Sequence, residues 1–123
     1  MVLQIKRVYD APSVIDGRRI LVDCLWPRGI PRDQAKIDQW PKDIAPSHEL
    51  RRWFDHDPQK WIEFQARYER ELADPTRQAI LRYIRDSAEK GRVTLLFAAK
   101  DCGRNNAVVL RRWLSPPKNG SKV

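Results

Sequence analysis

The chain has 123 residues, of which 41% are hydrophobic and 33% charged, and it contains five tryptophans. This length suits one domain around a single core, and the apolar and aromatic content excludes an intrinsically disordered chain. No apolar run approaches the ~20 residues of a membrane-spanning helix, so we expect no membrane partner. The formal net charge is +8, and residues 92–123 hold seven basic side chains against one acidic one.

The thiols and imidazoles indicate a reducing compartment and no metal centre. Cys24 and Cys102 are far apart in the sequence, and the first ten residues lack the pattern of a secretory signal. We therefore expect a cytoplasmic protein with both thiols free. The cysteines and the two histidines, His48 and His56, match no zinc-binding spacing, so no metal is predicted.

The N-terminal part of the chain predicts two strands. Residues 3–9 mix apolar and polar side chains as a half-exposed strand does, and turn-forming residues follow. Residues 19–26 are apolar and β-branched at their centre, which predicts a strand covered on both faces. Pro27, which lacks an N–H donor, and Gly29, which tolerates unusual backbone angles, should end this strand.

A proline-rich stretch and three helices come next. Residues 30–46 contain three prolines and should form an ordered loop, with a short helix between residues 33 and 40 as an option. Ser47, Asp57 and Asp74 each stand where an N-cap residue is expected, ahead of apolar side chains at helical spacing. We predict helices over residues 47–55, 58–72 and 75–90, and we assign their aromatic stripe to the core.

The last part of the chain predicts a strand, a helix and a tail. Residues 93–99 are apolar enough for a buried strand, and residues 106–114 have the spacing of a helix. Residues 116–123 are expected to be a flexible basic tail. The whole pattern predicts an α/β fold in one domain, residues 1–115, in which a short, mainly parallel sheet is flanked by the helices.

Polar side chains follow two of the predicted strands, where ligands of open parallel sheets gather. If strands 19–26 and 93–99 are parallel neighbours, both junctions lie at one edge of the sheet. The free N–H groups and dipole of the last helix would favour an anion there. The ligand-binding candidates are Trp26, Arg28, Gly29, Cys102, Arg104, Asn105 and Asn106, and the catalytic candidates are Asp23, His56 and Asp101.

Each candidate also has a purely structural interpretation. Asn105 can cap the last helix while Arg104 is solvated, and His56 can belong to a capping corner between two helices. Asp23 ends a buried strand and needs a partner. Arg28 is close in sequence, and this pair is either structural or orients Arg28 towards a ligand. Cys102 lacks the arginine spacing of a phosphatase loop. No dinucleotide fingerprint, Walker A motif or zincin motif occurs, so no cofactor is predicted.

Several motifs together resemble the YeaO-like family, the bacterial domain of unknown function 488. They are RVYDAP, ILVDCLWPRG, the long run from IDQWPKDIAPSHELRRWFDHDP to EREL, VTLLFAAKD and NNAVVL, which together cover about residues 5–114. The resemblance implies a small cytoplasmic α/β protein and brings no established reaction. By position it points to Asp23, Trp26, Arg28, Asp43, Ser47, Arg51, Trp53, His56, Asp57, Asp101 and Asn105.

Two residues depart from the pattern of that family. Cys24 stands where relatives typically carry an arginine, and Arg104 stands where they often carry a histidine. More distant members have a Cys-His-Arg triplet that residues 102–104 match only in part. If that histidine is catalytic elsewhere, this chain either lacks the activity or uses His56.

Two functional hypotheses follow. The first is a protein, with or without enzymatic activity, that binds a phosphate- or carboxylate-bearing small molecule at the sheet edge through Arg28 and Arg104. The alternative is a nucleic-acid- or protein-binding module that uses the basic C-terminal quarter. Oligomeric state and reaction type are left open.

Overall fold

The computed structural model describes residues 1–115. Its centre is a three-stranded parallel sheet in the order β1-β3-β2, formed by Val2–Arg7, Arg92–Phe97 and Arg18–Leu21 respectively. The helices are α1 (Arg32–Ala35), α2 (His48–Phe54), α3 (Trp61–Leu72), α4 (Gln78–Lys90) and α5 (Asn106–Leu114). The predicted α/β class and parallel sheet are therefore confirmed. Residues 116–123, the predicted tail, lie outside the described residues.

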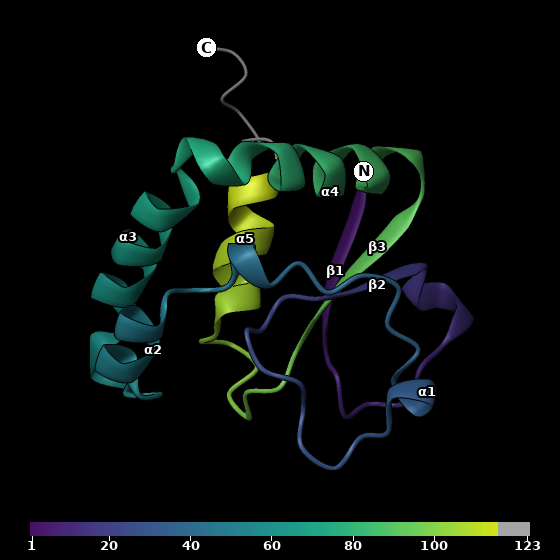
Figure 1. Cartoon of the computed structure of the whole chain (residues 1–123), viewed down its shortest axis with the longest axis horizontal. Coiled ribbons are helices and arrows are strands. Elements are labelled where there is room, and N and C mark those ends of the chain that lie inside the picture. Colours follow the sequence, from purple (N-terminus) through teal and green to yellow (C-terminus); the bar gives the residue numbers. More distant parts are fainter. Residues whose placement is uncertain (116–123) are drawn as a thin grey trace.

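Both faces of the sheet are covered, by different parts of the chain. Figure 1 shows α3, α4 and α5 gathered on one side of the strands, while the loop that contains α1 runs at the other end of the molecule. Because side chains alternate along a strand, Leu95 and Phe97 enter the large core with these helices, whereas Leu96 joins a second cluster. Trp26, Ile30, Ile37 and Trp40 from the loop cover that second cluster.

The second strand is shorter than predicted. β2 ends at Leu21 instead of Trp26, although the Val22 N–H still donates to the Leu96 carbonyl over 3.1 Å. One residue later, the Asp23 carboxylate accepts a hydrogen bond from the Ala98 N–H at 2.9 Å, where a continuing strand would offer a backbone carbonyl. The side chain therefore completes the ladder, and the backbone is free to turn away with Trp26.

The helices follow the predicted segments with modified starts. Residues 58–60 and 75–77 form 3-10 helices, capped by Asp57 and Asp74, that lead into α3 and α4. Each of these 3-10 helices begins with a proline, which has no N–H to donate and is therefore tolerated in a first turn. Short 3-10 turns are common at the starts of α-helices. Ser47 caps α2, and α5 covers residues 106–114 as predicted.

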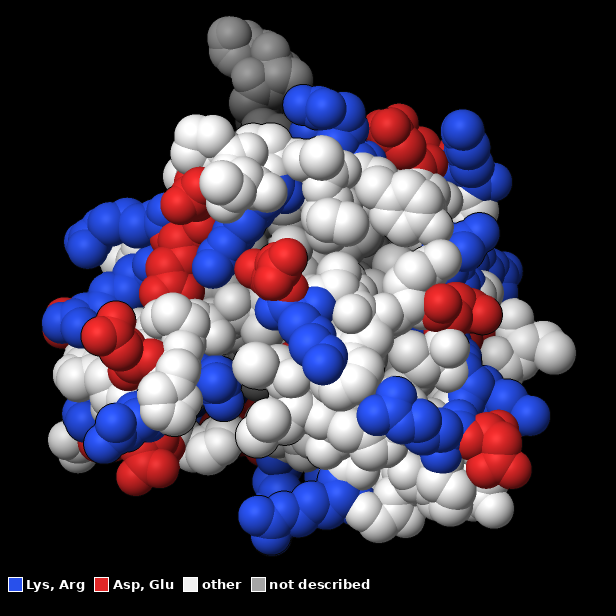
Figure 2. All heavy atoms as spheres, viewed as in Figure 1, with Lys and Arg blue, Asp and Glu red and all other residues white. Residues whose placement is uncertain are grey.

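Within residues 92–115, the basic side chains of the C-terminal quarter lie on separate parts of the fold. Arg92 begins β3 and Lys100 follows its other end, so the six-residue strand of ~20 Å lies between them. Arg112 bonds Gln65 on α3, and Arg104 pairs with Asp101. On the face shown in Figure 2, basic and acidic side chains are interspersed.

Candidate functional site

A cavity of about 850 Å³ opens at the carboxyl ends of β2 and β3. Its walls come from the segment after β2, from α2 with its flanking residues, and from the loop between β3 and α5. This is the edge of the sheet where the two predicted junctions were expected to meet, and the parallel pairing of β2 with β3 brings them together. The lining includes Asp23, Trp26, Arg28, Arg51, His56, Lys100, Asp101, Asn105 and Asn106.

Asp23 is the half-buried carboxylate of this cavity. One of its oxygens accepts from the Ala98 N–H at 2.9 Å and the other from the Asn106 amide at 3.1 Å. The Asn106 amide also donates to the Val22 carbonyl at 3.0 Å, which ties α5 to the end of β2. Burial raises the pKa of Asp23, and these two hydrogen bonds together with the charges of Arg51 and His56 offset only part of that effect.

Arg28 does not pair with Asp23, contrary to one interpretation of the sequence. The backbone of Arg28 is held by Tyr9, whose hydroxyl donates to the Arg28 carbonyl at 3.0 Å. The Arg28 side chain is exposed at the cavity. The partners of Asp23 are instead Ala98 and Asn106, because the turn after β2 directs the carboxylate towards β3 and α5.

Four basic side chains line the cavity: Arg28, Arg51, Arg52 and Lys100. Within residues 1–115, none of the four forms an ion pair. Arg51 is half-buried and donates through Nε to the Pro46 carbonyl at 3.3 Å. The cavity therefore has several guanidinium and ammonium groups that are free to meet an anion.

The short helix α2 brings three lining residues that the sequence analysis did not single out, His48, Arg52 and Phe54. Leu50 and Phe54 anchor it in the core, and Phe54 stacks on Phe64 of α3 with ring centroids 4.2 Å apart. Asp55 and His56 then both adopt left-handed backbone conformations, with φ of 46° and 55°. Such residues are strained, and the strain often marks functional positions; here the turn places His56 at the cavity.

The loop before α5 is closed on itself by the side chain of Asp101. The Asp101 carboxylate accepts from the N–H groups of Gly103 at 3.0 Å and Arg104 at 3.2 Å, and it pairs with the Arg104 guanidinium at 3.1 Å. These bonds lower the pKa of Asp101, with the Gly103 N–H contributing most. Asn105 caps α5 by accepting from the Val108 N–H. The Asp101 carboxylate therefore occupies the N–H groups of the loop, and Asn105 occupies one N–H group of the first turn of α5.

Three of the predicted ligand-binding residues consequently do not line the cavity: Gly29, Cys102 and Arg104. Asp101 draws Arg104 back onto the loop, and the exposed Cys102 faces the Lys100 carbonyl across 3.8 Å. Trp26 lines the cavity but is committed to packing, since its indole N–H donates to the Ile30 carbonyl and its ring contacts Trp40. Asp23, His56 and Asp101 all line the cavity, as do Arg28, Asn105 and Asn106.

Residues that the residue patterns did not indicate are Tyr9, His48, Arg52, Phe54, Phe64 and Lys100. Lys100 directly follows the predicted strand 93–99 and could have been found from that position. His48 and Arg52 could not, because the cavity-facing side of α2 depends on how α2 packs on α3.

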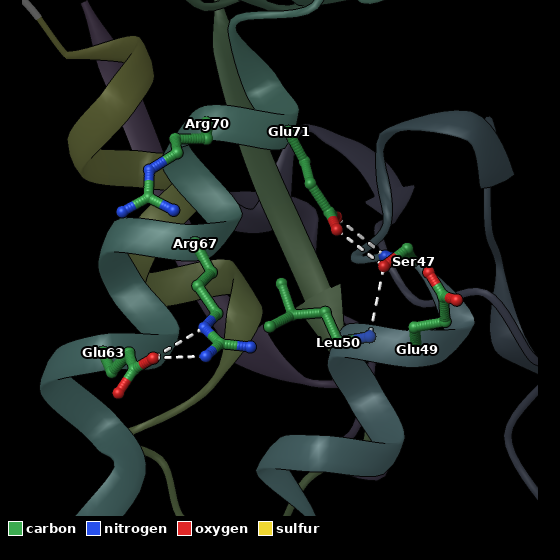
Figure 3. A pocket seen from close by; sticks show the side chains of 7 residues that line it. All are labelled: Ser47, Glu49, Leu50, Glu63, Arg67, Arg70 and Glu71. Atoms are coloured by element: carbon green, nitrogen blue, oxygen red, sulfur yellow. Dashed lines mark hydrogen bonds and ion pairs between the residues drawn. The ribbon is translucent and has the colours of Figure 1, made fainter.

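A second hollow, of about 370 Å³, lies between α2 and α3 (Figure 3). Two of its carboxylates already have partners. Glu71 accepts from the backbone N–H of Ser47 at 2.8 Å and from its hydroxyl at 2.6 Å, and Glu63 pairs with Arg67. This hollow therefore joins the two helices and is a weaker candidate site than the cavity.

The described residues contain no group of three or more metal-ligating side chains placed to hold an ion. Over residues 1–115 there is also no helix with the length and apolarity needed to cross a bilayer. Cys24 and Cys102 are both free thiols.

Comparison with known proteins places the chain in a family. A family model described as the inactive DUF488-N3 subclade matches residues 2–121. The uncharacterized protein YeaO of Escherichia coli is 43% identical over 93% of this chain and 97% of its own length. The chain belongs to the YeaO-like DUF488 family. An uncharacterized Mycobacterium tuberculosis protein, Rv3073c, is 39% identical over 92% of this chain and 93% of its own. No solved structure matches.

The family resemblance and the cavity select overlapping residues. Of the positions to which the YeaO-like motifs point, seven line the cavity: Asp23, Trp26, Arg28, Arg51, His56, Asp101 and Asn105. Others serve the fold, because Ser47 caps α2, Asp57 caps the following 3-10 helix and Trp53 packs beneath Lys60 and Arg67. Cys24, which departs from the family pattern, also lines the cavity.

Proposed function

We propose that this DUF488 protein binds a small molecule with a carboxylate or phosphate group in the cavity at the carboxyl ends of β2 and β3. We further propose that it binds this molecule without catalysing a reaction on it. The observation that carries the proposal is the set of four basic side chains, Arg28, Arg51, Arg52 and Lys100, that line one cavity without ion-pair partners in the described residues. A volume of about 850 Å³ is in the range of small-molecule sites.

Binding without turnover is supported by two further points. The matching family model is described as an inactive subclade. In addition, the loop that would carry a Cys-His-Arg triplet in more distant relatives here reads Cys102-Gly103-Arg104, and neither Cys102 nor Arg104 lines the cavity. The candidate acid–base groups Asp23, His56 and Asp101 then serve recognition and structure.

Calorimetric titration with 3-phenylpropionate and with phenyl phosphate tests the proposal. Replacing Arg51 by Gln or Arg28 by Ala should weaken binding of both anions about tenfold, because a hydrogen bond to a charged group is worth ~1.5–3 kcal/mol. Arg104→Gln is the matched control, since Arg104 lies outside the cavity and is already paired. Circular dichroism would verify that each variant is folded.

Two results would overturn the proposal. The first is that neither anion binds at millimolar concentration and that L-phenylalanine, which also carries a carboxylate, does not bind either. The second is a loss of affinity in Arg104→Gln that equals the loss in Arg51→Gln, because that would indicate nonspecific attraction by net charge instead of a site.

A further inference from the structure

Asp23 and Arg51 carry opposite charges that line the same cavity without contacting each other. Within residues 1–115 neither of them forms an ion pair. Both line the cavity, and the positive charge of Arg51 lowers the pKa of Asp23, against the larger effect of burial. Two half-buried opposite charges normally pair, since charge removed from water is costly unless it is compensated. Within residues 1–115, the hydrogen-bond partners of the Asp23 carboxylate are instead two uncharged groups, the Ala98 N–H and the Asn106 amide.

The carboxylate of Asp23 has capacity for another donor. Its two oxygens each accept one hydrogen bond, from the Ala98 N–H and the Asn106 amide, whereas a carboxylate can accept about four. The guanidinium of Arg51 likewise uses only Nε within the described residues, so its terminal N–H groups are available for a bidentate contact with an anion.

The charge of Asp23 also argues against a ligand that is only an anion. A carboxylate or phosphate that reached Arg51 would lie in the field of the Asp23 carboxylate, which would repel it. A ligand that carries a cationic group beside its anionic group would instead satisfy both side chains. Apolar surface from Leu25, Phe54 and Phe64 lies in the same cavity and offers contact for a hydrocarbon side chain.

We infer that the ligand is a zwitterion of the α-amino-acid type with an apolar side chain. Its ammonium group binds Asp23, its carboxylate binds Arg51, and its side chain packs along Phe54 and Leu25. This inference rests on the proposed function and narrows it, because it requires a positive group on the ligand in addition to the anion. Both hydrogen-bond donors to the Asp23 carboxylate are uncharged, and an ammonium group would add a charged one.

Three ligands of one shape test the inference on the unmodified protein. L-phenylalanine has both charges, 3-phenylpropionate lacks the ammonium group, and 2-phenylethylamine lacks the carboxylate. We expect phenylalanine to bind at least about tenfold more tightly than either analogue in calorimetric titration, since each analogue leaves one charge of the cavity unpaired.

Two variants then assign the preference to a residue. Asp23→Asn should lower the affinity for phenylalanine about tenfold, to the level of 3-phenylpropionate, whose own affinity should not fall. Asp86→Asn is the control, because Asp86 is an exposed carboxylate of α4 that does not line the cavity, and this variant should keep the full preference for phenylalanine.

The possible failures are distinguishable. If 3-phenylpropionate binds as tightly as phenylalanine, the zwitterion inference is wrong and the anion site stands. If neither compound binds and phenyl phosphate does not bind either, the proposed function fails as well. Should Asp23→Asn not fold, the three-ligand comparison on the unmodified protein still decides the inference.

Discussion

Asp16 is a buried carboxylate surrounded by donors. It accepts from the Arg19 guanidinium at 2.6 Å, from the Lys6 ammonium at 3.0 Å and from the Ser13 N–H at 2.9 Å. Burial by itself would raise the pKa of Asp16, but these hydrogen bonds and the charge of Lys6 outweigh it and lower the pKa. Asp23, with one amide and one backbone donor, shows the opposite shift. The number and charge of the donors decide the direction.

This difference predicts a pH-dependent stability. Because the folded-state pKa of Asp16 is lowered, its contribution is complete above its ordinary pKa of about 4 and is lost as the pH falls through the lower folded value. Asp16→Asn should cost about 3 kcal/mol in the free energy of unfolding at pH 7, since it leaves Arg19 buried without its counter-charge. Urea unfolding at several pH values should show this cost shrinking towards acid pH.

The exposed Asp10 provides the control for that series. Asp10→Asn should leave stability within ~0.5 kcal/mol of the unmodified protein at neutral pH, as surface substitutions usually do. If the cost of Asp16→Asn were the same at every pH, the ionised form of Asp16 would not be the source of the stabilisation.

The turn between the first 3-10 helix (Val14–Asp16) and β2 depends on a glycine. Gly17 has φ of 64°, in the left-handed region, and a Cβ atom on it would lie 2.2 Å from the Arg92 carbonyl oxygen. This close approach lets β2 start beside the first residues of β3. Gly91, at the end of α4, differs on both points, because its φ is −171° and a Cβ atom there would meet nothing within 4 Å.

Alanine substitutions at these two glycines should therefore differ in sign. Gly17→Ala should destabilise the protein by about 2 kcal/mol or more through backbone strain and the clash with Arg92. Gly91→Ala should leave stability unchanged or raise it by ~0.5 kcal/mol, because it restricts only the unfolded chain. Midpoints of urea unfolding measure both, and equal losses in the two variants would contradict the argument.

At the scale of the whole molecule, the basic side chains of residues 92–115 are spread over separate parts of the fold. Arg92 begins β3, Lys100 follows its other end, and Arg104 is paired with Asp101. We expect a gel-shift assay with duplex DNA in about 0.15 M salt to show no complex. A complex that weakens when Arg111 and Arg112 are replaced by Gln would instead favour the nucleic-acid-binding alternative, and its steep salt dependence would confirm the electrostatic origin.

Local signals predicted elements well where a capping residue and the apolar spacing agree. Asn105 and the apolar side chains of residues 107–114 are sufficient to define α5, because a cap and an amphipathic stripe are properties of neighbouring residues. The end of β2 could not be predicted in the same way. It depends on Asp23 meeting the Ala98 N–H, a contact between residues 75 positions apart.

The candidate site likewise has a part that local sequence patterns predicted and a part that depends on contacts between distant residues. The order of apolar and polar residues by itself determined that two strands end in polar loops, and the parallel pairing then placed Asp23 and Asp101 at one cavity. Only the tertiary structure decided that Arg51 and Arg52 line this cavity while Arg104 does not. The orientation of α2 comes from the packing of Phe54 on Phe64, and Arg104 is held by a carboxylate of its own loop. Helix orientation and charge pairing are set by packing between distant segments, which no local pattern encodes.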